Sequence, residues 1–290
     1  DLFLPYATSL RMSEVGYQSN IQDSLKISYN NLDEFINALV KGIKTPVKKF
    51  NDIGMFDDAG IAQQISTGIL QIENELYDIV RPKRSGPSGS RPASLLKTGG
   101  IEYLELRGID VNPFIPEGID VSKIKLLDIY ITHSLISESP LISDKEIEEI
   151  KANQKIMVSK GRLKNVMLSK NGDLISLAEL RKNFLAELEQ TAEALDEYSE
   201  GYLKAFHLEI NKNMLQSEKI LAEMDVKGFE FQEYALNQSK KIAENFDSSD
   251  ISDFYALTNS AQASIENLRN LEESSSMDIN KYVELYNSKI

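Results

Sequence analysis

The chain has 290 residues, of which 41% are hydrophobic, and this is enough apolar material for the core of one large domain or two modest ones. Its net charge of −13 argues against a nucleic-acid-binding protein or a protein that binds anionic membranes, because both need basic surfaces. The absence of cysteine excludes disulfides and favours a cytoplasmic location, and the apolar runs are too short to span a membrane.

Proline and glycine are distributed unevenly along the chain. All eight prolines and eleven of the fifteen glycines lie at or before Pro140. We therefore expect a turn-rich, mixed first part and a mostly helical remainder, which together make an α+β protein. The chain begins with Asp1, and the Leu-Phe-Leu-Pro run that follows is typical of the interior of a structure, so we expect a fragment of a longer protein.

The first clear helix is predicted from Leu32 to Ile43. Its apolar residues recur with the helical period, and the pattern stops at Thr45-Pro46. Pro46 also suits the first turn of a second short helix, with Thr45 as its cap. The expected buried face of that second helix consists of Val47, Phe50 and Ile53.

Strands are predicted over residues 65–80 and 100–110, with loops at 57–60 and 85–92. In the stretch "GGIEYLELRGIDVNPF", Tyr103, Glu105 and Arg107 share one face of the predicted strand, because side chains alternate along it, and Leu104 and Leu106 share the other. The polar face is either a solvated surface with an ion pair worth ~0–1 kcal/mol, or a cation ligand beside an anion-binding arginine.

Two further stretches carry similar groups. In "LQIENELYDIVRPKR", Glu73, Glu75 and Tyr77 alternate with other side chains. A basic cluster then follows, made of Arg81, Lys83, Arg84, Arg91 and Lys97. This stretch is either an acidic edge strand with a basic turn or part of a site for an anionic ligand. "LPYATSLRMSEVGY" adds Arg11 and Tyr17 near a turn glycine.

Beyond Asp120 the pattern changes to helices. A helix is predicted from about residue 121 to 135, with a strand as the alternative because the segment is rich in β-branched residues. Ser143 with Glu146, and Ser176 with Glu179, match the capping box that begins a helix. Further amphipathic segments are predicted over 217–246 and 251–271. The isolated His133 and His207 fit surface or capping positions better than ligand positions.

Taken together, the three quoted stretches resemble the carboxy-terminal half of bacterial glutamate–cysteine ligase of the gammaproteobacterial type. The resemblance covers roughly residues 1–120 and fades beyond about 135. It implies a fold like that of glutamine synthetase, in which a curved antiparallel sheet forms a half-barrel and helices pack outside. It also implies a division into part of the catalytic core at 1–125 and a helical region that packs on it at 126–290.

The resemblance implies an ATP-dependent reaction with glutamate and cysteine as substrates. ATP phosphorylates the γ-carboxylate of glutamate, and the cysteine amine attacks the γ-glutamyl phosphate to give γ-glutamylcysteine, the first step of glutathione synthesis. Mg²⁺ ions would bridge the phosphate oxygens. Two alternatives remain: a related ligase that joins glutamate to another amine, and a non-catalytic helical interaction module with a degenerate ligase remnant.

Each candidate residue takes its role from the same resemblance. Glu105 matches a magnesium ligand, and Arg107 matches an arginine that faces the transferred phosphate. Arg11 matches a residue that reaches the glutamate carboxylate, while Tyr17 and Tyr77 match tyrosines around cysteine. The basic residues expected to bind ATP are Arg81, Lys83 and Arg84. Because the family's other metal ligands lie mostly in its amino-terminal half, this chain is expected to carry half a site and to need that half as a partner.

Overall fold

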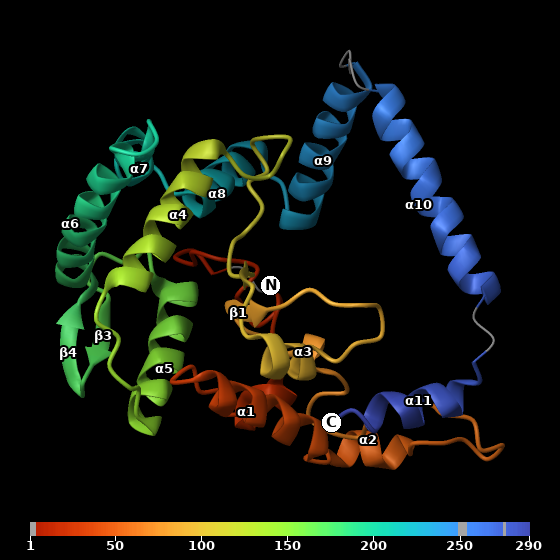
Figure 1. Ribbon diagram of the computed structural model, residues 1–290. Coiled ribbons are helices and arrows are strands. Elements are labelled where there is room, and N and C mark those ends of the chain that lie inside the picture. The colour runs from red at the N-terminus through yellow and green to blue at the C-terminus, as the bar shows by residue number, and fades with distance from the viewer. Residues whose placement is uncertain (1–3, 249–253, 275–276) are drawn as a thin grey trace. The chain divides into compact units, whose positions relative to one another are not determined.

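The computed structural model describes residues 4–248, 254–274 and 277–290 (Figure 1). The chain forms two compact units, Asp1–Gln18 with Arg107–Ala243, and Ser19–Leu106 with Glu244–Ile290. We call these unit 1 and unit 2 and describe each by itself. Within the described ranges, helices predominate over two antiparallel strand pairs, which confirms the α+β class and the helical carboxy-terminal region. Those ranges include no helix long and apolar enough to cross a membrane.

Unit 2 is built around helix α1 (Leu32–Lys44), which confirms the first predicted helix. The Asn31 side chain accepts a hydrogen bond from the Glu34 backbone N–H at 2.8 Å and so caps its start. The helix stops at Thr45, because Pro46 disfavours the helical conformation at the residue before it. Thr45 therefore ends α1. It does not cap the start of the next helix, which was the role predicted from the sequence. Its hydroxyl donates to the Lys41 carbonyl at 2.7 Å.

The second short helix, α2 (Lys48–Ile53), begins after Val47 and has no buried residue. The predicted apolar face is wrong, since Ile53 is 57% exposed. The core of unit 2 lies instead between α1 and α3 (Pro92–Gly99), a helix that begins with proline at its first position. Its buried apolar residues are Leu25, Phe35, Ile36, Leu39, Ile43, Leu70, Leu76, Ala93 and Leu96.

The strand predicted over 65–80 is absent. That segment crosses the end of α1, where the Ile69 and Leu70 N–H groups donate to α1 carbonyls or its cap. Gly68 lies so close to the Ile43 carbonyl that no Cβ would fit. A single 3₁₀ turn, η2 (Glu73–Glu75), follows. The alternation of apolar and acidic residues was misleading, because Leu70 and Leu76 enter the core from irregular backbone.

A short antiparallel pair follows that turn. Strand β1 (Val80–Lys83) pairs with β2 (Tyr103–Leu106), so only four residues of the predicted strand 100–110 are extended. The pairing sets Arg81 directly opposite Glu105. Leu104 is 45% exposed, so the two faces of β2 do not divide into a core side and a solvent side.

Unit 1 packs α4 (Val121–Ile136) and α7 (Tyr202–Ile210) against α6 (Leu177–Asp196), around Ile129, Leu188, Ala192 and Phe206. The Asp120 carboxylate accepts the Lys123 N–H at 2.7 Å and caps α4. This confirms the helix and excludes the strand alternative. The β-branched residues of α4 are accommodated because the helix is held by its cap and by packing.

The rest of unit 1 contains one predicted and one unpredicted feature. The capping box of Ser143 and Glu146 opens α5 (Asp144–Lys160) as predicted, and Ser176 caps α6 through the Glu179 N–H. Between them lies a hairpin of β3 (Met167–Lys170) and β4 (Asp173–Ser176), which the sequence analysis missed. Its turn, Asn171-Gly172, takes positive φ at both residues, 57° and 88°.

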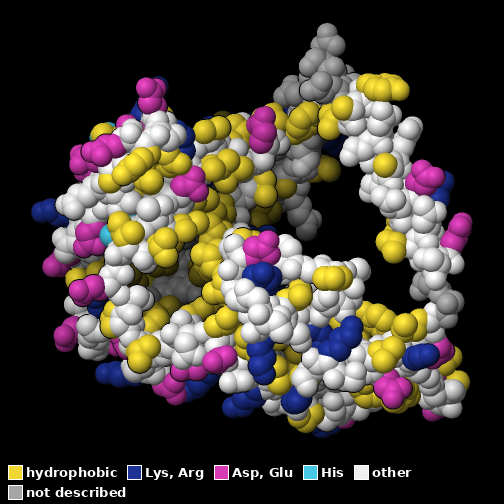
Figure 2. Space-filling model, viewed as in Figure 1, with side chains coloured by type: hydrophobic (Ala, Val, Ile, Leu, Met, Phe, Trp, Pro, Cys, Tyr) yellow, Lys and Arg dark blue, Asp and Glu magenta, His cyan; other side chains and the backbone are white. Residues whose placement is uncertain are grey.

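The amphipathic segment predicted over 217–246 is two helices. Gly228, at φ 65°, ends α8 (Gln216–Lys227) before α9 (Phe231–Ser248) begins. Helix α10 (Phe254–Ser274) covers most of the segment predicted at 251–271, and residues 251–253 lie outside the described ranges. Large apolar side chains are exposed along α10, as Figure 2 shows; they include Leu257, Ile265, Leu268 and Leu271. Helix α11 (Ile279–Asn287) follows. The division at residue 125 stays a prediction.

Candidate active site

In unit 2, the candidate metal ligand Glu105 is held by an arginine on the neighbouring strand. The Arg81 Nε and Nη2 atoms donate to Glu105 Oε2 at 3.1 and 2.9 Å. The Arg81 side chain is 4% exposed and that of Glu105 is 29% exposed. A buried, fork-shaped guanidinium bound to one carboxylate oxygen fixes the direction of that carboxylate, which can therefore present ligand atoms in one orientation.

Arg81 is itself fixed by the turn that precedes its strand. Its Nη1 donates to the backbone carbonyls of Asn74 and Leu76, at 2.7 and 3.2 Å. Lys83 lies alongside, with its ammonium 3.2 Å from Asn74 Oδ1 and 4.0 Å from Glu105 Oε2. The arrangement brings together three predicted site residues, Arg81, Lys83 and Glu105.

A small cavity of about 20 Å³ lies beneath this cluster. It is lined by Glu73, Asn74, Arg81 and Lys83 on its polar side and by core residues such as Phe35 and Leu96 on the other. This volume accommodates one water molecule and no substrate. A substrate of this cluster must therefore approach the exposed side of Glu105.

Arg84, the third basic residue expected to bind ATP, points to the end of α3. Its Nη1 donates to the Gly99 carbonyl at 2.5 Å and lies 3.4 Å from the Gly100 carbonyl. A cation at the carboxy-terminal end of a helix satisfies carbonyls that have no partner inside the helix. Arg84 thus has a capping role in this structure, and its contact with ATP stays a prediction.

Arg91, a member of the basic cluster in the sequence, is buried in the structure. It is 1% exposed, and its guanidinium is paired with Glu73, which is 4% exposed. The loop over 85–91 ends where Pro92 begins α3. The basic residues near that loop therefore divide into buried, capping and strand positions, which no sequence pattern distinguished.

In unit 1, three predicted site residues meet at one ring. The Arg107 Nη1 donates to the Tyr17 hydroxyl at 2.5 Å. The guanidinium carbons of Arg11 and Arg107 lie 4.9 and 5.4 Å from the centre of the Tyr17 ring. Arg11 Nε also donates to the Arg107 carbonyl. Two cations on one aromatic ring form a concentrated positive patch, which suits a carboxylate or phosphate ligand.

Asp110 organises this cluster, and the sequence analysis did not identify it. Its Oδ1 accepts the backbone N–H groups of Leu10 and Arg11 at 3.0 and 2.8 Å, and its Oδ2 accepts the Ser9 hydroxyl. Gly16 is equally necessary, because a Cβ there would meet the Arg11 carbonyl as the chain turns toward Tyr17. The available signal for Asp110 was its place in the sequence, as a short polar residue shortly after a strand.

Tyr77 belongs to unit 2, whereas Tyr17 belongs to unit 1. It is 41% exposed, and its backbone N–H donates to Gln22 Oε1 at 2.9 Å. The boundary between the units falls between Leu106 and Arg107. The cooperation of Tyr17 with Tyr77, and of Glu105 with Arg107, in one substrate site therefore stays a prediction.

The donor set for a metal is a single carboxylate. Among the residues described, no three His, Asp, Glu or Cys side chains converge as a metal site would require. The other glutamates of these stretches are engaged: Glu73 with Arg91, Glu75 with the Gln71 N–H at 2.7 Å, and Glu102 with the Ser85 N–H at 2.8 Å. Glu105 is engaged as well, by Arg81, and it is the candidate ligand because of the family resemblance.

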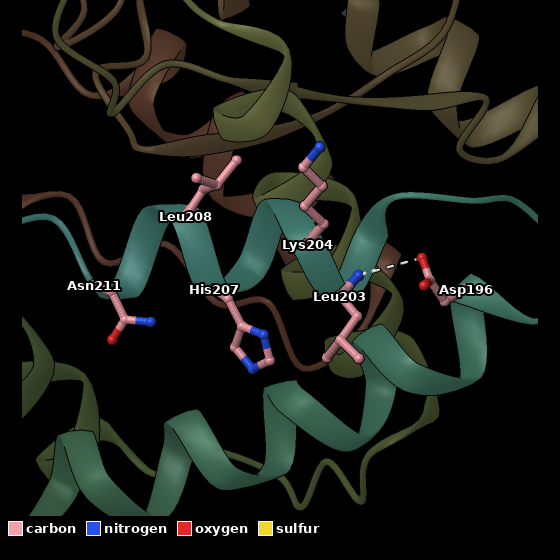
Figure 3. A pocket seen from close by; sticks show the side chains of 6 residues that line it. All are labelled: Asp196, Leu203, Lys204, His207, Leu208 and Asn211. Atoms are coloured by element: carbon pink, nitrogen blue, oxygen red, sulfur yellow. Dashed lines mark hydrogen bonds between the residues drawn. The ribbon is translucent and has the colours of Figure 1, made fainter.

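A larger and shallower hollow, about 670 Å³, lies on α6 and α7 of unit 1 (Figure 3). It is lined by Asp196, Leu203, Lys204, His207, Leu208 and Asn211. Two of its polar residues have structural partners: Asp196 accepts the Tyr202 N–H at 2.6 Å, and His207 lies 2.7 Å from Glu189. His207 thus occupies a surface position beside Glu189, as expected, and none of the candidate site residues lines this hollow.

The protein is of the α+β class, with one cluster in which an arginine fixes a carboxylate and another in which two arginines lie on a tyrosine ring. Comparison with known proteins gives the family. The family profile described as glutamate-cysteine ligase matches residues 1–157. The chain belongs to the glutamate–cysteine ligase family.

Individual relatives agree. The chain is 35% identical over its whole length to the glutamate–cysteine ligase of Pseudomonas putida KT2440, of which it covers 56%. It is 36% identical to that of Alcanivorax borkumensis, with 84% of this chain and 49% of the relative covered. The chain thus spans about half the length of the curated relatives it matches.

Solved structures support the fold. The crystal structure of glutamate–cysteine ligase from Francisella tularensis in complex with AMP matches with a TM-score of 0.86 at 27% identity, covering 98% of this chain and 57% of that one. A bifunctional glutathione synthetase from Pasteurella multocida matches with a TM-score of 0.55 at 19% identity, over 83% of this chain and 27% of that one. At that identity the second match concerns the fold alone.

Proposed function

We propose that this chain is the carboxy-terminal portion of a cytoplasmic, ATP-dependent glutamate–cysteine ligase. The enzyme would form γ-glutamylcysteine through a γ-glutamyl phosphate, with glutamate, cysteine and ATP as its substrates. The observation that carries the proposal is that family likeness covers the strand that holds Glu105 and the cluster around Arg107. The AMP bound to the Francisella tularensis relative supports a nucleotide as one ligand.

Mg²⁺ fits Glu105 as one ligand among several. The ion commonly takes one or two carboxylates and completes its octahedron with water and phosphate oxygens. When bound, it would neutralise charge on the phosphate oxygens of ATP. Arg81 holds Glu105 through one oxygen, which orients the carboxylate for such a role. The remaining protein ligands would come from the amino-terminal portion of the enzyme.

The arginine cluster supplies the anion contacts in this proposal. Arg107 would donate its planar fork to the phosphoryl group during transfer, while the Tyr17 hydroxyl holds the guanidinium in place. Arg11 would bind the glutamate carboxylate, and Tyr17 and Tyr77 would line the cysteine site. Of Arg81, Lys83 and Arg84, Lys83 is the best candidate for the ATP phosphates, because its ammonium lies 4.0 Å from Glu105.

The test is phosphate release by the chain combined with the amino-terminal portion that its relatives have. We expect release to require both glutamate and cysteine, and γ-glutamylcysteine to appear in equal amount. Release that another amine supports better than cysteine would favour the related-ligase alternative. No ATP-dependent release with any amine would favour the non-catalytic module.

A further inference from the structure

The carboxy-terminal helix α11 is built into the unit that carries Glu105. The Asn280 side chain donates to the Gly60 carbonyl at 2.7 Å and accepts the Ala62 N–H at 2.8 Å. The Asn287 side chain donates to the Ile65 carbonyl at 2.7 Å. Val283 and Tyr286 are buried, at 4% and 6% exposed. These contacts fix α11 to segments more than two hundred residues earlier in the chain.

A buried ion pair lies under this helix. Arg91 Nε donates a hydrogen bond to Glu73 Oε1 at 3.0 Å, and Arg91 Nη2 lies 3.0 Å from Glu73 Oε2, so one hydrogen bond and one close charge contact join the pair. The two side chains are 0% and 2% exposed. Tyr286 covers the pair: its ring centre lies 4.3 Å from the guanidinium carbon, and its carbonyl accepts from Nη1 at 3.3 Å.

This pair is costly to place where it is. Charged groups lose their hydration when buried, and such a pair seldom stabilises a fold better than apolar residues of the same size. Two ordinary apolar side chains would have filled the space between η2, α3 and α11. The pair therefore invites an explanation beyond core stability, and the atoms next to Glu73 supply one.

Glu73 begins the turn that holds Arg81, and Arg81 supports the candidate metal ligand Glu105. The following carbonyls, of Asn74 and Leu76, accept Arg81 Nη1, and Arg81 in turn binds Glu105 Oε2. Arg81 thus holds the Glu105 carboxylate, the turn holds Arg81, and the ion pair with Arg91 holds Glu73 at the start of the turn. A flexible or rotated turn would release Arg81.

We propose that Glu73, Arg91 and Tyr286 form a positioning relay for Glu105. The residues that hold Glu105 in place would thus extend from Arg81 in β1 to Tyr286 in α11. None of its three residues touches a substrate or the metal. The proposal rests on the proposed function, in which Glu105 binds Mg²⁺.

The first test replaces the pair by apolar residues, Glu73→Leu with Arg91→Met, in the enzyme completed by its amino-terminal portion. Because both charges are removed, no unpaired charge is buried, and the variant is expected to fold. Mn²⁺ binding, followed by electron paramagnetic resonance in the presence of ATP, gives a readout that does not depend on turnover. We expect metal affinity to fall by about 10-fold, as for other residues that orient a metal ligand.

The kinetic pattern distinguishes positioning from simple loss of folded enzyme. We expect the Mg²⁺ concentration for half-maximal rate to rise by a similar factor, while the KM for glutamate stays unchanged. A lower rate with unchanged metal affinity would overturn the proposal. A matched control is Lys123→Met, which removes a partner of the buried Glu209 in unit 1. It should lower stability without changing metal affinity.

Tyr286 provides a second route if the double variant fails to fold. Tyr286→Phe keeps a ring over Arg91 and should bind metal normally, whereas Tyr286→Leu keeps the carbonyl, loses the ring and should bind it more weakly. Equal metal affinity in both variants would contradict the relay. Glu105→Gln separates the two proposals: if it leaves Mn²⁺ binding intact, the proposed function fails, and if it abolishes binding while the relay variants do not weaken it, only the relay fails.

Discussion

Arg107 illustrates how much one side chain contributes at the residue scale. Its guanidinium is bound to the Tyr17 hydroxyl and lies beside Arg11, so its planar fork has a defined direction. A lysine in its place would keep the charge but lose the fork.

We expect Arg107→Lys to lower kcat by roughly 10²–10³, the usual effect of losing one electrostatic contact to a transition state. Stopped assays of phosphate release would measure the effect, with circular dichroism as the check on folding. Tyr17→Phe, which removes only the hydroxyl, should cost less. A lysine variant with nearly full kcat would make Arg107 a structural residue.

Glu209 makes a prediction about pH. Its side chain is 1% exposed and binds both Lys123 and Lys212. Burial tends to raise the pKa of the Glu209 carboxyl, but hydrogen bonds from Lys123, Lys212 and Ser122 and the Lys123 charge outweigh it and hold the pKa below its usual range. The folded state thus binds a proton less readily than the unfolded state. The stabilisation is present above the unfolded pKa of about 4.3 and is lost as pH falls through the folded value.

We therefore expect Glu209→Gln to be less stable than the parent at pH 7. As the pH falls from about 5 to about 3, the range around the unfolded pKa, the variant should lose less stability than the parent. Urea unfolding at a series of pH values measures this. Glu193→Gln, on the exposed face of α6, serves as the control. Parallel pH curves for Glu209→Gln and the parent would contradict the assignment.

The site residues and their chemical types could be predicted from the sequence, but their partners could not. Arg11, Tyr17 and Arg107 were recognised from separate motifs, and they do meet. Asp110 was missed because its role depends on backbone N–H groups about a hundred residues away. The burial of Arg91 could not be predicted, since a pattern of charges contains no information on burial when the partner, Glu73, lies on another element.

At the element scale, local signals were reliable where one side chain decides the outcome. The predicted caps Ser143 and Ser176 each begin a helix, because each satisfies an N–H that the helix cannot, whereas the predicted cap Thr45 ends one. Alternation was less reliable, since irregular backbone at 65–80 buries alternate residues as well as a strand would. The Asn-Gly pair at 171–172 is typical of a hairpin turn, and it is the signal from which β3 and β4 could have been predicted.

That hairpin allows a direct test of the turn. Gly172 has φ 88°, a conformation that costs other residues about 1–2 kcal/mol. We expect Gly172→Ala to lower the free energy of unfolding by about 1 kcal/mol. Gly172→Asn, a residue that tolerates positive φ, should cost less. Chemical denaturation of both variants would measure the difference, and an alanine variant as stable as the parent would mean that the turn has another conformation.

For the whole molecule, the α+β class and the helical second part could be predicted from composition, because all eight prolines and eleven of the fifteen glycines lie at or before Pro140. The division into two contact units could not. Unit 2 combines 19–106 with 244–290, and only tertiary packing of the last helix against the first core creates that unit.

A further prediction concerns residues 1–290 without the amino-terminal portion of the enzyme. Residues 1–290 by themselves should form no γ-glutamylcysteine, since Glu105 alone cannot complete an octahedral metal shell. Adding the amino-terminal portion as a separate chain should restore synthesis if the two complete one site. The assay is phosphate release dependent on glutamate and cysteine, and robust turnover by 1–290 alone would require other metal ligands within it.

The central claim is that Glu105 binds the metal of an ATP-dependent ligase, and Glu105→Gln tests it most directly. The amide preserves the shape of the side chain but cannot supply an anionic oxygen. The measurement is the rate of γ-glutamylcysteine formation by the completed enzyme as a function of Mg²⁺ concentration, with circular dichroism to verify the fold. The account predicts a folded variant that has lost most of its activity and requires far more Mg²⁺. A parental rate with an unchanged Mg²⁺ dependence would contradict it.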